Sequence, residues 1–155
     1  MTKHSGVRDV TPLVVRTPGD GFRTEITAGG HVLVADEPLT AGGTNAGPTP
    51  YDFVAAALGA CMAMTVRWYA SRRGWPLDEV TVRLRHRRDH ANDCESCERQ
   101  PVGIDEVLVD VELAGALTDE RRRLLLAIAE RCPVEQTLAA GVRVRQAAGA
   151  QPAAA

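Results

Sequence analysis

Apolar and polar residues alternate in two stretches of the second half of the chain. Alternation runs over Val80–Arg87 and returns over Ile104–Leu113. A period of two residues is typical of a strand with one buried face, so both stretches are predicted strands. Arg83, Arg85 and Arg87 form a basic face on the first stretch, and Asp110 and Glu112 on the second are the acidic residues expected to pair with that face.

The first third of the chain predicts shorter strands separated by turns. The apolar positions around Pro12 predict an edge strand at best, because proline donates no hydrogen bond to a sheet. Phe22–Thr27 and His31–Ala35 flank Gly29-Gly30, which is the pattern of a hairpin. The glycine-rich stretch from Glu37 to Pro48 predicts a loop.

A long helix after this loop is the clearest prediction. Thr49 supplies an N-cap hydroxyl, Pro50 suits the first helical position, and Asp52 places a carboxylate three residues after the cap. Gly74 ends the helix, which we expect to reach about Arg73.

The long helix carries an apolar stretch whose small residues leave it thin on nearly all sides. This stretch, Phe53–Val66, is shorter than the roughly 20 residues that a membrane span needs. We therefore predict a core helix surrounded by other structure, and no membrane partner.

The C-terminal part predicts two more helices and a last strand. Thr118 caps a helix that breaks at Cys132-Pro133, and a short helix follows through Leu138. Val142–Arg145 predicts a final strand, and residues 147–155 a disordered tail. Runs of strands combined with helices indicate an α+β fold.

Length and composition predict one domain over residues 1–146 of the 155. The net charge of −2 and the aromatic content of 4% argue against nucleic acid as a partner. No apolar run follows the N-terminal charges, so we expect no signal peptide and a cytoplasmic protein. Cysteines in such a protein are expected to be reduced rather than paired for structure.

Two cysteines occupy positions with opposite electrostatics. Cys132 lies before Pro133 at the expected start of a helix, where backbone amides and the helix dipole lower a thiol pKa. Cys61 lies deep in the long helix among apolar neighbours, which disfavour a thiolate. From the residues alone, Cys132 is the more acidic thiol, and a reactive Cys61 needs a cation delivered from elsewhere in the fold.

Three segments together resemble one known family. They are Gly47-Pro48-Thr49-Pro50-Tyr51-Asp52-Phe53, Ala55-Ala56-Ala57-Leu58-Gly59-Ala60-Cys61 and Arg131-Cys132-Pro133-Val134. They resemble the OsmC/Ohr family, which comprises osmotically inducible proteins and organic hydroperoxide resistance proteins. The resemblance implies antiparallel sheets around a long central helix, in an intertwined homodimer.

The resemblance also implies a chemistry: a thiol-dependent peroxidase that reduces organic hydroperoxides and protects against oxidative stress. Cys61 is then the peroxidatic thiol that becomes a sulfenic acid, and Cys132 resolves it by forming a disulfide. A dithiol reductant such as a lipoylated protein restores both thiols, and no cofactor is needed. An apolar approach to the thiol is expected from Phe53, Leu58, Met62 and Met64.

The chain departs from the family at one activating residue. The family glutamate directly follows the proline that opens the helix, and here that position is Tyr51. Asp52 lies one residue later, about 100° around the helix, so it does not simply substitute. Arg23, before the predicted hairpin, is our candidate for the family's activating arginine.

Two other functions remain open. A non-catalytic dimer of this family would bind a small apolar ligand or another protein, and Tyr51 favours that alternative. A metal-binding protein would use His90, Cys94 and Cys97, with His86 nearby, since these are the ligand types of half a zinc site. A solvated loop remains the commoner explanation of a single Cys-x-x-Cys.

Overall fold

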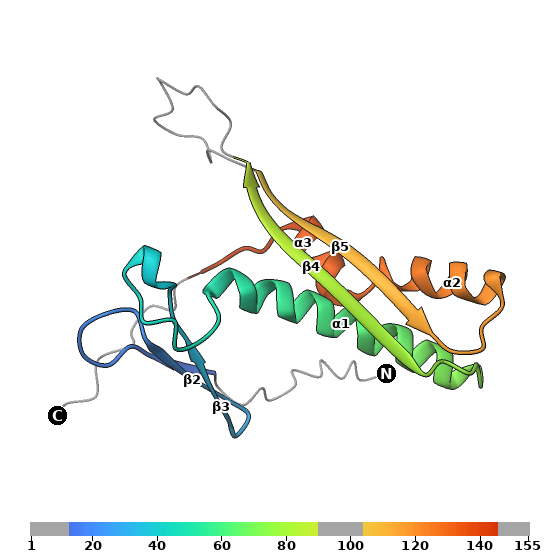
Figure 1. The fold of residues 1–155 in the computed structure, drawn as a ribbon, viewed down its shortest axis with the longest axis horizontal. Helices are drawn as coiled ribbons and strands as arrows, with labels where there is room; N and C mark the ends of the chain where they lie inside the picture. The colour runs from blue at the N-terminus through green and yellow to red at the C-terminus, as the bar shows by residue number, and fades with distance from the viewer. Residues whose placement is uncertain (1–12, 90–103, 146–155) are drawn as a thin grey trace, which may run out of the picture. The chain divides into compact units, whose positions relative to one another are not determined.

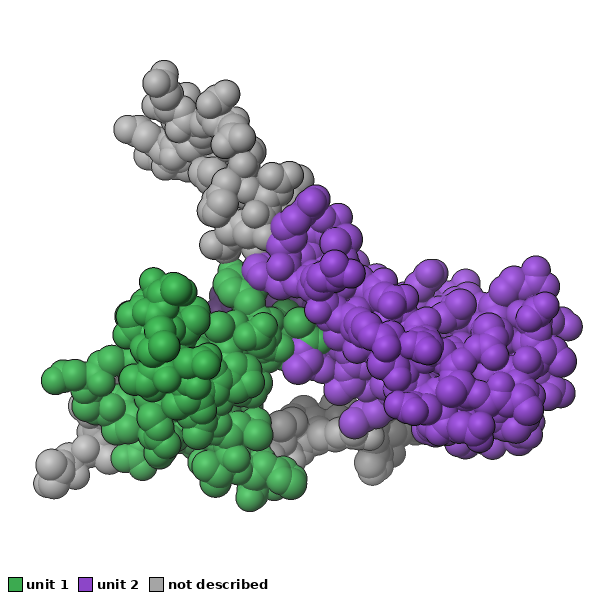
Figure 2. All heavy atoms as spheres, in the orientation of Figure 1, with its two compact units in different colours: residues 1–55 green, residues 56–155 purple. Residues whose placement is uncertain are grey.

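The computed structural model describes residues 13–89 and 104–145, and the chain divides into two compact units, residues 1–55 and 56–155 (Figures 1 and 2). Apart from a short 3₁₀ helix, the strands and helices follow the order that the sequence predicted for residues 13–140, and the fold is α+β. In chain order the elements are β1 (Val14–Arg16), β2 (Thr24–Ala28), β3 (His31–Ala35), the 3₁₀ helix η1 (Leu39–Ala41), α1 (Pro50–Arg72), β4 (Glu79–Asp89), β5 (Ile104–Ala114), α2 (Asp119–Ala129) and α3 (Pro133–Ala140).

The first unit is built on a three-stranded antiparallel sheet in the order β1-β2-β3. The predicted hairpin is confirmed, because Ala28 pairs with His31 around the two glycines. The sheet has little core of its own: Phe22 and Val32 are exposed, and only Ala35 and Asp36 are buried among the unit's described residues. Both faces of this sheet therefore offer apolar side chains that the described part of the unit does not cover.

A buried carboxylate organises the loop between β3 and α1. Asp36 accepts hydrogen bonds from the amides of Glu37 (2.8 Å), Thr44 (3.0 Å) and Ala46 (3.0 Å), and from the Thr44 hydroxyl (2.5 Å). These bonds hold the pKa of Asp36 at about 2 instead of 3.8, with the Thr44 hydroxyl as the largest cause. The segment predicted as a loop is thus a fixed connection that contains η1.

Replacing Asp36 with asparagine should lower Tm at pH 7 by roughly 5 to 10 °C, since an amide cannot accept all four bonds. The folded pKa lies below the unfolded one, so ionised Asp36 stabilises fully above about pH 4 and loses this contribution as pH falls toward 2. Thermal melts of both proteins from pH 7 to pH 2 should converge over that window. A difference in Tm between the two proteins that stays constant down to pH 2 would contradict a stabilising role for the charge of Asp36.

The start of α1 confirms the predicted capping box. The Thr49 hydroxyl accepts from the Asp52 amide at 3.2 Å, and the Asp52 carboxylate accepts from the amide and the hydroxyl of Thr49 at 2.9 and 2.7 Å. These bonds satisfy amides that a helix start otherwise leaves without partners. Asp52 is therefore part of the cap.

One face of α1 forms the core of the second unit with β5 and α2 (Figure 1). Gly59 lets the helix approach β4, because an added Cβ would lie 2.6 Å from the Leu84 side chain. The buried residues of this core recur every three or four positions along α1, as a helix requires. They are Leu58, Met62, Val66 and Ala70 from α1, with Leu77, Leu113, Leu125, Ala129 and Cys132 from the rest of the unit.

The opposite face of α1 departs from the prediction of a helix surrounded on nearly all sides. Met64 is 70% exposed and Trp68 59% exposed. The small residues predicted close packing, but the described chain supplies packing for one face only. By length and mean hydropathy α1 would also suit a membrane span, a test that core helices pass too, and its packed face identifies it as a core helix.

The two long strands β4 and β5 form an antiparallel pair in which Arg83 lies opposite Asp110. Arg83 contacts Glu112 at 2.8 Å and Asp110 at 3.7 Å, so the predicted cross-strand pairing is confirmed. The predicted strand Val142–Arg145 is wrong: the segment has no regular structure. A strand needs a neighbouring edge, and nothing in the described ranges pairs with it. The predicted tail, 147–155, lies outside the described residues.

Candidate functional site

Cys61 lies in a pocket of the second unit between α1 and the junction of α2 and α3. The thiol is half-buried, and the pocket has a volume of about 630 Å³. Its walls are mostly apolar, with a single cationic residue. The lining residues are Ala57, Ala60, Cys61, Met64, Thr65, Trp68, Arg131 and Pro133.

The predicted apolar approach to Cys61 is therefore only partly correct. Of the four residues named for it, Met64 lines the pocket. Leu58 and Met62 belong to the buried core face of α1 and line a different cavity, and Phe53 lines a cavity of the first unit. Residues next to each other on a helix point in different directions, so closeness in sequence to Cys61 did not place these side chains around the thiol.

Cys132 lies at the N-cap of α3, as predicted, but it is fully buried. Its Sγ accepts a hydrogen bond from the amide of Glu135 at 3.3 Å. The turn that carries it is fixed by a bond from the Cys132 amide to the carbonyl of Ala129 at 3.2 Å. The cysteine thus joins the core that α1 and α2 share.

Burial raises the pKa of the Cys132 thiol, and the amide of Glu135 lowers it by less. The expectation that the N-cap makes Cys132 an acidic thiol is therefore wrong. The helix-end amides are present, but removal from water disfavours the thiolate more strongly than they favour it. Cys132 is a neutral thiol at neutral pH.

The structure brings Cys61 and Cys132 together. Cys61 packs against the core that includes Cys132, and its side chain is close enough to raise the pKa of the Cys132 thiol further. Both cysteines are free thiols. A half-buried thiol and a buried thiol that lie near each other and are not bonded are an arrangement that can cycle between dithiol and disulfide.

The predicted activating residues belong to the first unit. Arg23 precedes β2 and forms an ion pair with Glu25 at 2.9 Å, with both side chains half-exposed. Tyr51 is exposed in the first turn of α1. Its neighbour Asp52 contributes to the helix cap.

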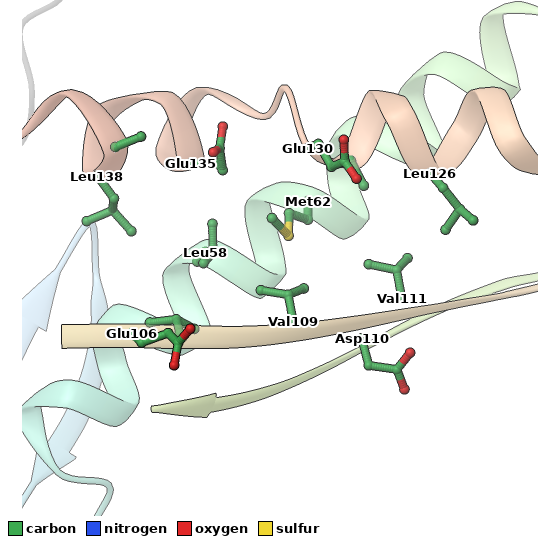
Figure 3. A pocket seen from close by; sticks show the side chains of 13 residues that line it. Leu58, Met62, Glu106, Val109, Asp110, Val111, Leu126, Glu130, Glu135 and Leu138 are labelled. Atoms are coloured by element: carbon green, nitrogen blue, oxygen red, sulfur yellow. The ribbon is translucent and has the colours of Figure 1, made fainter. Parts of the chain in front are cut away.

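A second cavity of about 720 Å³ lies between β5 and the helices α1, α2 and α3 (Figure 3). Leu58 and Met62 line it from α1, and Val109 and Val111 from β5. Acidic residues from α3 and from the end of α2 border it, as Figure 3 shows for Glu130 and Glu135. These two carboxylates, which flank Cys132 in the sequence, thus line a cavity other than that of Cys61.

The metal hypothesis falls on residues that the structure leaves out. His90, Cys94 and Cys97 lie outside the described residues, and His86 lies on β4. Within 13–89 and 104–145, no three histidine, cysteine or acidic residues gather as metal ligands. The prediction of a zinc site at this loop stays a prediction.

The family model of OsmC-like protein matches residues 43–146, which contain Cys61, Cys132 and every element from α1 onward. The chain belongs to the OsmC-like protein family. The family suggested by the cysteine motifs is thereby confirmed, together with its α+β fold and long central helix. No curated protein matches the chain.

Solved structures share the OsmC-like fold at low sequence identity. A putative osmotic stress induced and detoxification response protein from Psychrobacter arcticus is 19% identical, with a TM-score of 0.67 over 82% of this chain and 87% of that one. An organic hydroperoxide resistance protein OsmC from Legionella pneumophila is 20% identical, with a TM-score of 0.60 over 81% and 88%. One from Elizabethkingia anophelis is 17% identical, with a TM-score of 0.60 over 83% and 89%.

Sequence reasoning missed the charged residue of the Cys61 pocket. Arg131 was part of the motif around Cys132, yet its place beside Cys61 was not predicted, because the motif gives no information on what the residue before the cysteine faces. The structure places it in the lining of the pocket of the other cysteine, Cys61.

Proposed function

We propose that this OsmC-like protein is a thiol-dependent reductase of organic hydroperoxides, with Cys61 as nucleophile and Cys132 as resolving thiol. The observation that carries the proposal is the proximity of a half-buried Cys61, which lines an apolar pocket, to a buried Cys132. The names of the relatives from Legionella and Elizabethkingia, organic hydroperoxide resistance proteins, agree with it. The apolar pocket suits the organic part of such a substrate better than hydrogen peroxide.

The reaction has two steps on the protein. The Cys61 thiolate attacks the terminal oxygen of the hydroperoxide, the O–O bond breaks, and an alkoxide leaves and takes up a proton to become an alcohol. The resulting sulfenic acid is attacked by the sulfur of Cys132, which forms the disulfide and releases water. A dithiol reductant, such as a lipoylated protein, then reduces the disulfide and is itself oxidised.

Burial of Cys132 suits this order of events. Because its raised pKa keeps Cys132 neutral, it puts no negative charge beside Cys61 and can donate a hydrogen bond to the Cys61 thiolate. Cys61, the thiol that meets the substrate, is half-buried, whereas Cys132 is fully buried and kept from the substrate. A peroxide entering the pocket therefore reaches Cys61 first.

Arg23 and a second copy of the chain complete the proposed site. Arg23 is the candidate for the family's activating arginine, and to act so it must exchange its ion pair with Glu25 for the site. An intertwined homodimer would cover the exposed face of α1 and the sparsely covered sheet of the first unit.

Mass spectrometry of the protein before and after one equivalent of cumene hydroperoxide tests the proposal. Free thiols are alkylated and the linked peptides mapped. We expect a disulfide between Cys61 and Cys132 to appear within seconds. Unchanged thiols on both residues, or oxidation confined to Cys94 and Cys97, would overturn the peroxidase proposal.

The alternative is a non-catalytic family member that binds a small apolar ligand. Tyr51 in place of the family glutamate favours it, and so does the cavity of about 720 Å³ at β5, which has the size of a ligand site. Peroxide consumption that stays normal in a Cys61→Ser variant would favour this alternative over catalysis by Cys61.

A further inference from the structure

The cation of α1 nearest to Cys61 in sequence, Arg67, is held elsewhere, because it donates to the carbonyls of Leu77 and Asp78. Cys61 lies in the interior of α1, where each backbone amide is already bonded within the helix and the N-terminal dipole no longer acts. Thr65 does not help, because its hydroxyl donates to the Cys61 carbonyl at 2.7 Å. A favourable charge must come from a neighbouring element.

The junction of α2 and α3 supplies such a charge from within the same unit. Among residues 13–89 and 104–145, Arg131 is the only charged residue that lines the Cys61 pocket. Its backbone is fixed on both sides: the amide donates to the carbonyl of Ile128 at 3.1 Å, and the carbonyl accepts from the Gln136 side chain at 3.2 Å. The base of this side chain therefore does not depend on a mobile loop.

We infer that Arg131 is a further functional residue of the site, whose guanidinium favours the thiolate of Cys61. The inference extends the proposed function and concerns the same pocket. It gives each residue of the Arg131-Cys132 pair its own role toward Cys61. The arginine raises the fraction of Cys61 present as the nucleophile, and the cysteine forms a disulfide with it afterwards.

The other charges near this junction do not cancel that of Arg131. Glu130 and Glu135 line the cavity at β5 instead of the Cys61 pocket (Figure 3). Cys132 beneath the pocket is neutral at neutral pH. Arg131 itself is exposed, so water screens its charge and the effect on Cys61 is smaller than that of a buried ion pair.

Alkylation of Cys61 by iodoacetamide between pH 5 and pH 10, read peptide by peptide in the full-length protein, tests the inference. In Arg131→Gln we expect the rate of Cys61 alkylation at pH 7 to fall roughly twofold to fivefold, the size of effect expected of a charge that water screens. Arg131→Lys should restore most of the rate, and Arg131→Glu should slow it further than Arg131→Gln. Alkylation rates in this order would follow the charge at position 131. Circular dichroism of each variant checks in parallel that the fold is unchanged.

Arg123→Gln is the matched control, because Arg123 is exposed on α2 and does not line the pocket. It should leave the alkylation rate of Cys61 at pH 7 unchanged. A rate that stays the same in Arg131→Gln and Arg131→Glu, or that falls only in Arg23→Gln, would overturn the inference. The readout needs no peroxide. A rate that falls in Arg131→Gln, in a protein that forms no disulfide with cumene hydroperoxide, would therefore support Arg131 while the proposed function fails.

Discussion

Replacing Cys61 with serine should lower the rate of cumene hydroperoxide consumption by roughly 10³-fold or more, to the level of the uncatalysed reaction with the reductant. A serine hydroxyl at this position has no base beside it and cannot take the oxygen from the peroxide under the same conditions. Steady-state peroxide assays with a dithiol reductant measure the loss. The fold should survive, since serine is close in size to cysteine and Cys61 is only half-buried.

Cys132→Ser separates the two thiols. Without the resolving sulfur, Cys61 should still react once with peroxide and remain as a sulfenic acid, which a dimedone adduct on its peptide detects. Turnover with a dithiol should then be slower, because the reductant must attack the sulfenic acid itself. Rapid formation of a disulfide by Cys61 with some other residue in this variant, or the absence of any Cys61 oxidation in the wild type, would contradict the assigned roles.

The sequence predicted the helices and paired strands because their signals are local. The cap at Thr49 and Asp52 needs only residues three apart, and the alternation of β4 and β5 already shows which of their side chains share a face. The candidate site came from the spacing of two motifs within a known family. The motifs identified the two cysteines, and the structure added that they lie near each other.

Properties that depend on distant neighbours could not be predicted. The acidity of Cys132 depends on two opposed effects, and burial by α1 and α2 outweighs the helix-end amides that the sequence does reveal. Asp36 directly precedes the glycine-rich stretch, and nothing in the sequence shows that amides of this loop donate hydrogen bonds to its carboxylate. For Val142–Arg145 the alternation was present, but a strand also needs an edge to pair with.

The exposed face of α1 raises the question of what covers it in solution. Helices that are apolar on all sides are normally buried on all sides, yet Met64 and Trp68 are exposed in the single chain. The first unit repeats the pattern, with Phe22 and Val32 exposed on a thin sheet. Monomers rarely leave this much apolar surface open, which supports the proposed homodimer.

Trp68→Glu should therefore convert the proposed dimer into monomers at micromolar concentration. A buried interface tryptophan typically contributes 2 kcal/mol or more, and two-fold symmetry removes it twice, so Kd should rise by roughly 10³-fold. The charge adds a desolvation cost in both copies. Sedimentation velocity of wild type and variant over a range of concentrations measures the change.

Leu124→Glu is the matched control for the introduced charge. Leu124 is 41% exposed on α2 and lies outside the Cys61 pocket, so its substitution should leave the sedimentation coefficient unchanged. If the wild type sediments as a monomer, the exposed face of α1 is not a dimer interface, and the proposed homodimer is wrong. If both variants dissociate, the contact extends over α2 as well, and α1 is not its centre. A dimer that persists only in the control would show that the face of α1 around Trp68 holds the two copies together beside the thiol pocket.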